Sequence, residues 1–466
     1  MEFIGRRQEI EALGKEFARP RPSLAVVLGR RRVGKSTMLL EAIKGRTAIY
    51  YQATRATVSV NLAFAKAAVA DVLGAEPLLS SLVDWEGVLA FLEKAAVEQP
   101  GLILILDEFP YLCDADPALP SIVQAVWDRV RANQTNFKLV LCGSKISFME
   151  GILAERNPLH GRQTLRLDIG PMPYRDAARF FPGWSADDCL LAYGVFGGMP
   201  YYLSLCDPAV SLAENVHDNV LAVGAPLAEE PDNLLQAELR DVSRYASLLR
   251  AIADGCTDTG KIIGRVREFS NASELAPYIS KLSELRLIRV VRSLDATERE
   301  RDRRYYLDDP FLAFWYRFVL PHRSALAAGH GIQVWRDRIA PWLDDYMGNL
   351  FEWVCRDYAR LYAQERLSSP GQTVGQIWAD DYDIDVAGQL LDGTALFGEC
   401  KWWKDPVGSN VLDHLVQCAA RTPYGKGAPR RVYTLYARSG FTDDVVAKAA
   451  ADPAVVLLTP EQLLGR

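Results

Sequence analysis

The first 170 residues alternate between short apolar runs and longer amphipathic stretches. Mostly apolar runs at 24–28, 48–52, 102–106 and 138–142 have the length of strands, and the aliphatic run at 102–106 is uninterrupted, as in a strand buried on both faces. Helical periodicity fills the intervals at roughly 58–73, 84–98 and 119–132. This alternation predicts a parallel sheet with helices on both faces.

The pattern changes after residue 170. A helical stretch runs from Tyr174 to Leu203. Residues 240–307 have the pattern of three short helices followed by two short strands, Leu287–Val291 and Arg304–Leu307, which predicts a winged helix-turn-helix. A helical bridge then leads into a final unit that mixes strands and helices. The expected domains are a core of alternating strands and helices at 1–170, a helical lid at 171–239, a winged helix at 240–308, a bridge at 309–340 and a separate α/β domain at 341–466.

The composition narrows the class of protein. Charged residues make up 24% and hydrophobic residues 49%, which is typical of a soluble globular chain. No stretch reaches 18 apolar residues and the N-terminus lacks an apolar signal core, so we expect a cytoplasmic protein without a membrane span. The eight scattered cysteines form no CxxC motif, in keeping with reduced thiols. The net charge of −6 argues against nonspecific binding of nucleic acid by the whole chain, but it leaves room for a local basic face.

The strongest chemical signal follows the first strand. Gly29–Ser36 fits the pattern GxxxxGK[ST] between a predicted strand and a predicted helix. The glycines allow a tight loop whose amides point at phosphates, and Lys35 adds its charge where the helix begins. Ser36 is expected to bind Mg²⁺. The sequence thus predicts an ATP site formed by Gly29, Arg30, Arg31, Arg32, Val33, Gly34, Lys35, Ser36 and Thr37.

A second motif completes this site. The aliphatic run at 102–106 leads directly into Asp107 and Glu108, which places two carboxylates at the carboxyl edge of the sheet beside the glycine loop. Asp107 is expected to hold the Mg²⁺ shell, and Glu108 to polarise the attacking water. The sequence therefore predicts hydrolysis of ATP as well as binding.

Several further motifs accompany these two and extend over the first 200 residues: Phe3–Glu9, Leu106–Phe109, Gly143-Ser144, Pro158–Arg162 and Gly197–Pro200. With them the chain resembles the archaeal-type P-loop ATPases of the STAND branch, related to AAA+ proteins, that carry a C-terminal DUF234 domain. The resemblance implies that Ile4, Gly5 and Arg6 line the adenine pocket. It also implies that Gly198 and Pro200 pack the lid against the base.

The same resemblance implies roles for three polar residues. Ser144, after the fourth strand, would sense the γ-phosphate; the alternative is a serine that satisfies local backbone. Arg162 or Arg156 would supply a finger-like charge to the transition state; the alternative is an ordinary surface arginine. His160 stands where the family often has an aromatic residue, which leaves the role of that loop open.

The predicted winged helix is modestly basic. Between Arg240 and Arg304 there are 14 Lys or Arg against 10 Asp or Glu. The basic side chains could follow DNA phosphates; alternatively, the segment packs against the nucleotide lid as part of the ATPase. The candidates for DNA contact are Arg265, Arg267, Lys281, Arg286, Arg289, Arg299, Arg301, Arg303 and Arg304.

A second chemical signal lies in the final unit. Asp385 sits in the strand-like run 383–386, fourteen residues before the run Glu399-Cys400-Lys401. Glu399 and Lys401 share one face of a strand, and Cys400 points to the other. If the two runs pair as a hairpin, Asp385 comes close to Glu399. Two carboxylates with a lysine can hold Mg²⁺ or Mn²⁺ and orient water for attack on a phosphodiester.

This spacing resembles the PD-(D/E)xK nucleases, and DUF234 domains resemble the restriction-endonuclease-like fold of those enzymes. Glu352, in a helical run, matches the acidic residue that those domains carry on their first helix, and Gln417 matches a polar position on a later helix. Ile384 stands in place of the motif's proline, so an inactive fold kept for binding or dimerisation is the alternative. The pair Trp402-Trp403 could stack on bases, or belong to the core or an interface.

Three hypotheses follow. In the leading one, Mg²⁺-dependent binding and hydrolysis of ATP controls a nuclease-like domain that acts on DNA, in the setting of defence or mobile elements by family analogy. The second is a slow regulatory switch with an inactive nuclease fold used for DNA or protein binding. The third, a chaperone-like ring ATPase, is weaker because no clear second arginine sensor is found. Self-association into a homo-oligomer is left open.

Overall fold

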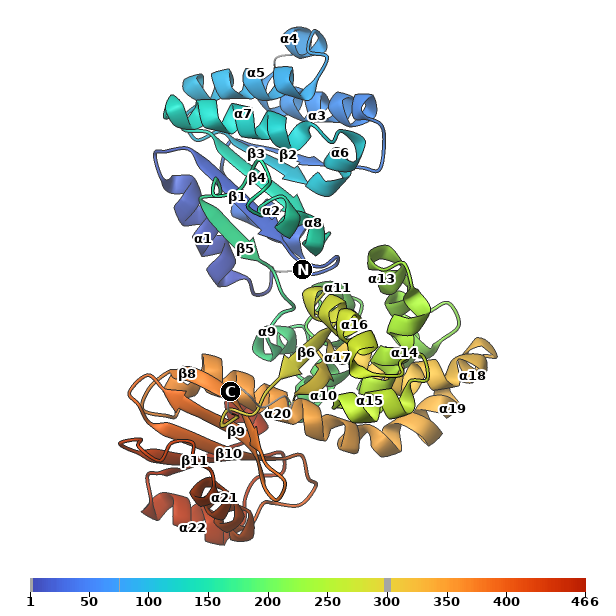
Figure 1. The fold of residues 1–466 in the computed structure, drawn as a ribbon, viewed down its shortest axis with the longest axis vertical. Helices are drawn as coiled ribbons and strands as arrows, with labels where there is room; N and C mark the ends of the chain where they lie inside the picture. Colours follow the sequence, from blue (N-terminus) through green and yellow to red (C-terminus); the bar gives the residue numbers. More distant parts are fainter. Residues whose placement is uncertain (1–2, 75, 297–302) are drawn as a thin grey trace. The chain divides into compact units, whose positions relative to one another are not determined.

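The computed structural model describes residues 3–74, 76–296 and 303–466. They form two compact units. The first comprises the residues up to Met172 together with Met199–Tyr201, and the second comprises Pro173–Gly198 and Tyr202–Arg466. Each unit is built around a five-stranded sheet of its own (Figure 1).

The sheet of the first unit is parallel throughout, with the strand order β2-β3-β4-β1-β5. The four predicted strands are confirmed to within one residue at each end. The fifth strand was not predicted, because it is a short edge strand whose residues alternate between half-buried and exposed. The strands are β1 (Ser23–Leu28), β2 (Ala48–Gln52), β3 (Ile103–Asp107), β4 (Lys138–Gly143) and β5 (Leu165–Asp168).

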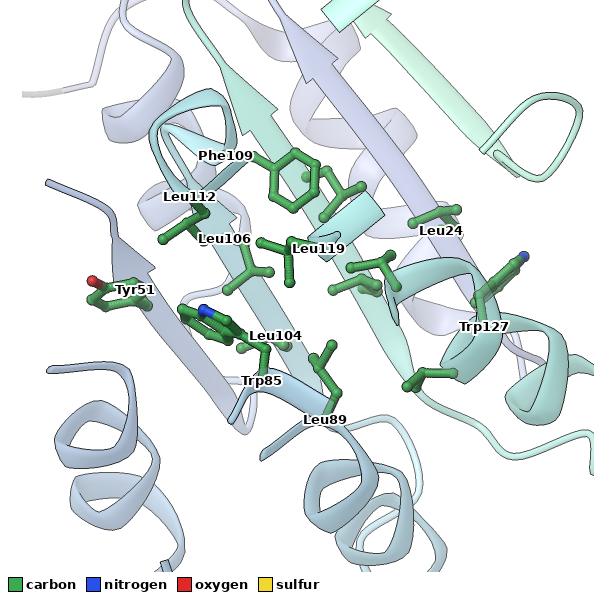
Figure 2. Packing of buried hydrophobic residues seen from close by; sticks show 14 of the residues in the cluster. Leu24, Tyr51, Trp85, Leu89, Leu104, Leu106, Phe109, Leu112, Leu119 and Trp127 are labelled. Carbon is green, nitrogen blue, oxygen red and sulfur yellow. The ribbon is translucent and has the colours of Figure 1, made fainter. Parts of the chain in front are cut away.

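Helices cover both faces of this sheet (Figure 1). On one face, Trp85 and Trp127 are buried against aliphatic strand residues such as Leu104 (Figure 2). Truncation of a buried tryptophan to alanine typically costs about 3–5 kcal/mol, so these rings anchor their helices to the sheet. The helices of the first unit are α1 (Arg7–Ala18), α2 (Lys35–Ala42), α3 (Val58–Leu73), α4 (Glu76–Ser80), α5 (Trp85–Glu98), α6 (Phe109–Ala115), α7 (Leu119–Ala132) and α8 (Ile146–Gly151).

The second unit begins with helices. Its last three helices before residue 288 are followed by an antiparallel ribbon of β6 (Ile288–Val291) and β7 (Arg304–Leu307). That order of elements agrees with the sequence prediction for residues 240–307. The helices before the ribbon are α9 (Tyr174–Ala178), α10 (Ala186–Phe196), α11 (Pro200–Ser204, whose first two residues belong to the first unit), α12 (Leu212–Val216), α13 (Glu230–Glu238), α14 (Val242–Ala253), α15 (Thr259–Arg265) and α16 (Ala272–Glu284). Those after it are α17 (Pro310–Phe314), α18 (Arg323–Ala327) and α19 (Gly331–Val334).

The chain then enters the long helix α20 (Leu343–Leu361), which packs against three strands of the second sheet. The strand order is β12-β11-β10-β9-β8, antiparallel from β8 to β10 and parallel from β10 to β12. A cluster of buried apolar residues joins α21 to this sheet. The elements are β8 (Gly371–Trp378), β9 (Asp383–Leu390), β10 (Ala395–Lys401), α21 (Ser409–Arg421), β11 (Arg431–Ala437), α22 (Asp443–Ala451), β12 (Val455–Leu458) and α23 (Pro460–Leu464).

Candidate functional sites

The glycine loop between β1 and α2 has the backbone that its sequence requires. Gly34 has φ +86°, a left-handed conformation that glycine adopts without strain. A side chain at Gly29 would collide with the carbonyl oxygen of Ile169, and one at Gly34 would meet Pro200 at 3.4 Å. The loop therefore tolerates no side chain at Gly29 and no ordinary one at Gly34, where Pro200 lies against it.

The loop presents positive partial charge. Gly34 is the N-cap of α2, no side chain of the described residues caps that helix, and its first turn contains no acid. The ammonium of Lys35, which is 6% exposed, donates to the carbonyls of Gly29 at 2.6 Å and Arg30 at 3.0 Å. Free amides at a helix start, together with a buried ammonium, form the donor set that binds a phosphate chain. The residues present therefore fit the phosphates of ATP.

Asp107 is the centre of a second group of contacts, and it is 1% exposed. Its Oδ2 accepts a hydrogen bond from Ser36 Oγ at 2.6 Å and another from the Tyr50 hydroxyl at 2.6 Å. Its Oδ1 accepts from the amide of Glu108 at 2.9 Å. The structure thus brings together Ser36 and Asp107, the two predicted Mg²⁺ ligands. A carboxylate beside a hydroxyl suits that hard cation.

Tyr50 is a residue that the sequence reasoning missed. It lies on β2, in register with Ile105 of β3, two residues before Asp107. Burial, followed by the hydrogen bond to Asp107, raises the pKa of Tyr50 well above its ordinary value, so the hydroxyl remains a donor. No motif marks this position. Only the pairing of β2 with β3 reveals it.

Glu108 adopts a left-handed backbone, with φ 53° and ψ 41°, which is uncommon for a residue other than glycine. Its carboxylate accepts hydrogen bonds from Ser144 Oγ at 2.8 Å and from the Ser144 amide at 3.3 Å. Ser144 follows β4, the neighbour of β3 in the sheet. The structure therefore places the predicted sensor in contact with the predicted base.

The N-terminal segment also reaches the loop. Arg6 is buried and donates to the carbonyl oxygens of Val33 in the loop and of Gly170. Ile4 and Gly5 precede it, and Gly5 lines an open hollow with residues of α1 and with Glu41 of α2. Of the three predicted adenine residues, Arg6 contacts the loop, where it supports the backbone.

The remaining residues of the predicted site differ in exposure. Val33 is buried, whereas Arg31, Arg32 and Thr37 are exposed. The guanidinium of Arg32 lies 4.5 Å from the centre of the Tyr201 ring.

Arg162 lies elsewhere in the first unit. Its guanidinium forms a two-pronged ion pair with Asp128 of α7, at 2.9 and 3.0 Å. The structure therefore brings Arg162 to α7 and not into the group formed by Ser36 and Asp107. Its role as a finger stays a prediction.

The second group of predicted residues lies in the C-terminal sheet. β9 and β10 pair antiparallel, with Gly398 opposite Val386, so the predicted hairpin is present. Asp385, one residue before Val386, contacts the opposite strand through its side chain: its Oδ2 accepts a hydrogen bond from the amide of Cys400 at 2.9 Å. Lys401 donates to Glu399 Oε1 at 2.6 Å.

The carboxylates of this group repel one another. Burial, and then the charge of Asp385, raise the pKa of Glu352 on α20 and the pKa of Glu399 on β10 to about 7. Burial also raises the pKa of Asp385. Burial lowers the pKa of Lys401, but its ion pair with Glu399 more than offsets this and leaves that pKa raised. Buried carboxylates that repel one another are the environment that a divalent cation relieves.

The arrangement of these carboxylates is not yet that of a metal centre. Among the residues that the structure describes, no group of three or more His, Cys, Asp or Glu side chains is placed to hold a metal ion together. Glu352 pairs with Arg356 at 3.2 Å and Glu399 with Lys401. The donor chemistry fits Mg²⁺ or Mn²⁺, although one oxygen of each glutamate is already engaged by a cationic side chain.

The two tryptophans after Lys401 differ. Trp402 is buried against Phe351 and its indole nitrogen donates to Asp344 at 3.3 Å, so it belongs to the core. Trp403 is 48% exposed. Gln417 lies exposed on α21, the predicted helix.

Two basic residues of the predicted winged helix are engaged within the second unit. Arg289 forms an ion pair with Asp308 and lies over the ring of Trp353 at 4.7 Å. Arg304 lies over the ring of Trp378 at 4.2 Å. Arg299 and Arg301 lie outside the described residues. Arg289 and Arg304 therefore hold the ribbon in place within the second unit.

In the part of the chain that the structure describes, every helix is too short or too polar to cross a membrane.

Comparison with known proteins gives two family matches. Residues 3–206 match a family described as ATPase domains predominantly from Archaea. Residues 315–411 match DUF234, described as archaeal and bacterial proteins of unknown function. An uncharacterized protein of Methanocaldococcus jannaschii is 30% identical over 407 residues, covering 86% of this chain and 87% of its own.

Solved structures resemble the fold. The Walker-type ATPase of Pyrococcus abyssi matches with a TM-score of 0.51 at 19% identity, over 68% of this chain and 96% of its own. The ORC2 protein of Aeropyrum pernix, solved as complexes with ADPNP and ADP, gives a TM-score of 0.45 at 16% identity, over 70% and 96% of the two chains.

Proposed function

The chain belongs to the archaeal-type ATPases that carry a C-terminal DUF234 domain, and on that premise we propose that it hydrolyses ATP at the glycine loop with Mg²⁺, and that the nucleotide controls a nuclease-like site acting on DNA. The observation that supports hydrolysis best is the contact of Ser36 with Asp107 beside that of Ser144 with Glu108. Binding alone would require the loop but no second carboxylate.

Each residue of the proposed ATP site has its own role in hydrolysis. The loop amides and Lys35 hold the phosphates, for which Lys35 leaves the carbonyls of Gly29 and Arg30. Ser36 and Asp107 would hold Mg²⁺, which would supply charge neutralisation at the phosphates. Glu108 accepts a proton from the attacking water, and its hydrogen bond from Ser144 fixes its orientation. Arg162 remains the proposed finger, and its surface ion pair with Asp128 is the alternative.

For the C-terminal domain we propose the restriction-endonuclease-like fold. The helix α20, the antiparallel run from β8 to β10, the helix α21 and the parallel β11 supply the elements that this fold requires. Glu352, Asp385 and Glu399 would hold Mg²⁺ or Mn²⁺, which supplies a Lewis acid at the phosphodiester. Lys401 would orient the attacking water once it parts from Glu399.

A second candidate function has its own observation. Arg356 and Lys401 already form ion pairs with two of the three carboxylates, as they would in a fold that has lost its metal. In that case the domain binds DNA or protein and ATP drives a switch. The engaged arginines Arg289 and Arg304 fit a winged helix that transmits nucleotide state within the chain in either case.

One experiment decides between these functions. Purified protein is incubated with plasmid and linear DNA and Mg²⁺ or Mn²⁺, with and without ATP, beside an Asp385→Ala/Lys401→Ala variant. Metal-dependent cleavage that the variant lacks supports the nuclease. Absence of cleavage under every condition, with ATP hydrolysis intact, favours the switch.

A further inference from the structure

A hydrogen-bond chain in the second unit joins the β6–β7 ribbon to the carboxylates of the C-terminal sheet. Its central member is Arg356 of α20, which is 7% exposed. Arg356 Nη1 lies 3.2 Å from Glu352 Oε2 and 3.1 Å from Gln376 Oε1. The same nitrogen donates to the backbone oxygen of Asp385 at 2.7 Å. Gln376, on β8, is 5% exposed and donates from Nε2 to the Tyr306 hydroxyl at 3.4 Å.

The geometry sets up a competition at Arg356. A terminal guanidinium nitrogen carries two hydrogens, whereas this one faces three acceptors. The acceptor on Gln376 therefore draws hydrogen-bonding capacity away from the carboxylate of Glu352. A weaker hold on Glu352 leaves its oxygens freer to bind a cation.

The ribbon fixes the far end of this chain. The amide of Leu294 donates to the carbonyl of Gln376 at 3.0 Å, and the amide of Trp378 donates to Ser293 Oγ at 3.1 Å, so the segment after β6 lies along β8. The ring of Tyr306 meets that of Trp353 edge-on at 6.0 Å. A displacement of the ribbon would therefore move Gln376 or its partner Tyr306.

We propose that Gln376 and Tyr306 are positioning residues that regulate binding of a divalent cation at Glu352, acting through Arg356, and that the ribbon thereby adjusts the C-terminal site. The proposal rests on the proposed metal site of that domain. It assigns the ribbon a role inside the protein, in which β7 contributes a hydroxyl to the buried chain of hydrogen bonds.

The test is calorimetric titration of Mn²⁺ into the full-length protein, without nucleotide. An Asp385→Asn variant gives the background from any other Mn²⁺ site. Gln376→Met keeps the length of the side chain but removes both polar atoms, which leaves Arg356 to Glu352. Tyr306→Phe removes only the hydroxyl. The matched control is Tyr305→Phe on the same strand. The Tyr305 hydroxyl lies 3.3 Å from Thr259 Oγ1 and takes no part in the hydrogen-bond chain through Arg356.

Gln376→Met should raise the Kd for Mn²⁺ about tenfold, the low end of what loss of an outer-sphere partner costs. Tyr306→Phe should raise it about threefold, as expected for one weak hydrogen bond. Gln376→Glu, a stronger acceptor for Arg356, should bind at least as tightly as the wild type. Circular dichroism checks that each variant is folded. If Gln376→Met does not fold, the titration of Tyr306→Phe alone tests the proposal.

The outcomes separate the two proposals. Wild-type protein that binds no more Mn²⁺ than Asp385→Asn overturns the metal site and the inference with it. Wild-type protein that binds Mn²⁺, with folded Gln376→Met or Tyr306→Phe unchanged, overturns the inference and leaves the metal site standing. An equal loss of Mn²⁺ affinity in Tyr305→Phe would also overturn the inference, because the Tyr305 hydroxyl takes no part in the hydrogen-bond chain.

Discussion

Replacing Tyr50 by phenylalanine removes a hydroxyl that donates to the Asp107 carboxylate at 2.6 Å and leaves the ring in place. Asp107 is 1% exposed, so water does not readily replace the lost donor. A hydrogen bond to a charged group contributes about 1.5–3 kcal/mol. The carboxylate keeps its bonds from Ser36 and from the Glu108 amide, so we take the lower end of that range. The loss then corresponds to roughly a tenfold change in an equilibrium constant.

That change should appear in the metal dependence of hydrolysis. We expect Tyr50→Phe to raise the Mg²⁺ concentration for half-maximal ATPase activity about tenfold, because the hydroxyl orients a carboxylate that would hold the cation. Phosphate release is measured against Mg²⁺ at saturating ATP. The control is Tyr51→Phe, next on the strand, whose hydroxyl instead donates to Asn61 at 2.6 Å. A Tyr50→Phe protein with the wild-type Mg²⁺ curve, or a Tyr51→Phe protein with the same shift, would refute this reasoning.

Four further predictions follow from other contacts. Ser144→Ala removes a hydroxyl that orients Glu108, so kcat for ATP should fall about 10–100-fold while ATP affinity, followed with a fluorescent analogue, changes little; a changed affinity with unchanged kcat would contradict this. In EDTA, Tm should fall as pH rises from about 5 to 7.5. In the folded protein Glu352 and Glu399 have pKa values near 7, above their usual 4.5. Across that pH range the folded protein therefore binds more protons than the unfolded chain, so its stability falls as the pH rises. Glu352→Gln should flatten this slope, and added Mn²⁺ should raise Tm most at the upper end of the range; a Tm independent of pH and of Mn²⁺ would contradict both expectations.

Local patterns made it possible to predict from the sequence that the residues of the proposed nucleotide site lie together. The glycine loop is a contiguous segment, and Asp107 ends an aliphatic strand, so the parallel sheet alone brings them together. Tyr50 could not be found in this way, because its contact with Asp107 depends on the lateral pairing of β2 with β3. The edge strand β5 was missed because four residues with alternating burial give little signal.

In the C-terminal site, too, some contacts could be predicted from the sequence and others could not. The hairpin that brings Asp385 near Glu399 follows from two short strands separated by a turn, and it could be predicted. The connection of Glu352 to Gln376 through Arg356 could not, because it joins a helix to strands distant in the sequence. Such a contact depends on how α20 packs on the sheet.

The most direct test of the account measures ATP binding and phosphate release on the same preparations of wild type, Lys35→Ala and Glu108→Gln. Lys35→Ala should lose most of its affinity for ATP, since the ammonium belongs to the phosphate site. Glu108→Gln should bind ATP like the wild type and release phosphate at least about a hundredfold more slowly, because the amide cannot take the proton. A Glu108→Gln protein with full turnover, or a Lys35→Ala protein with unchanged ATP affinity, would contradict the assignment of this site.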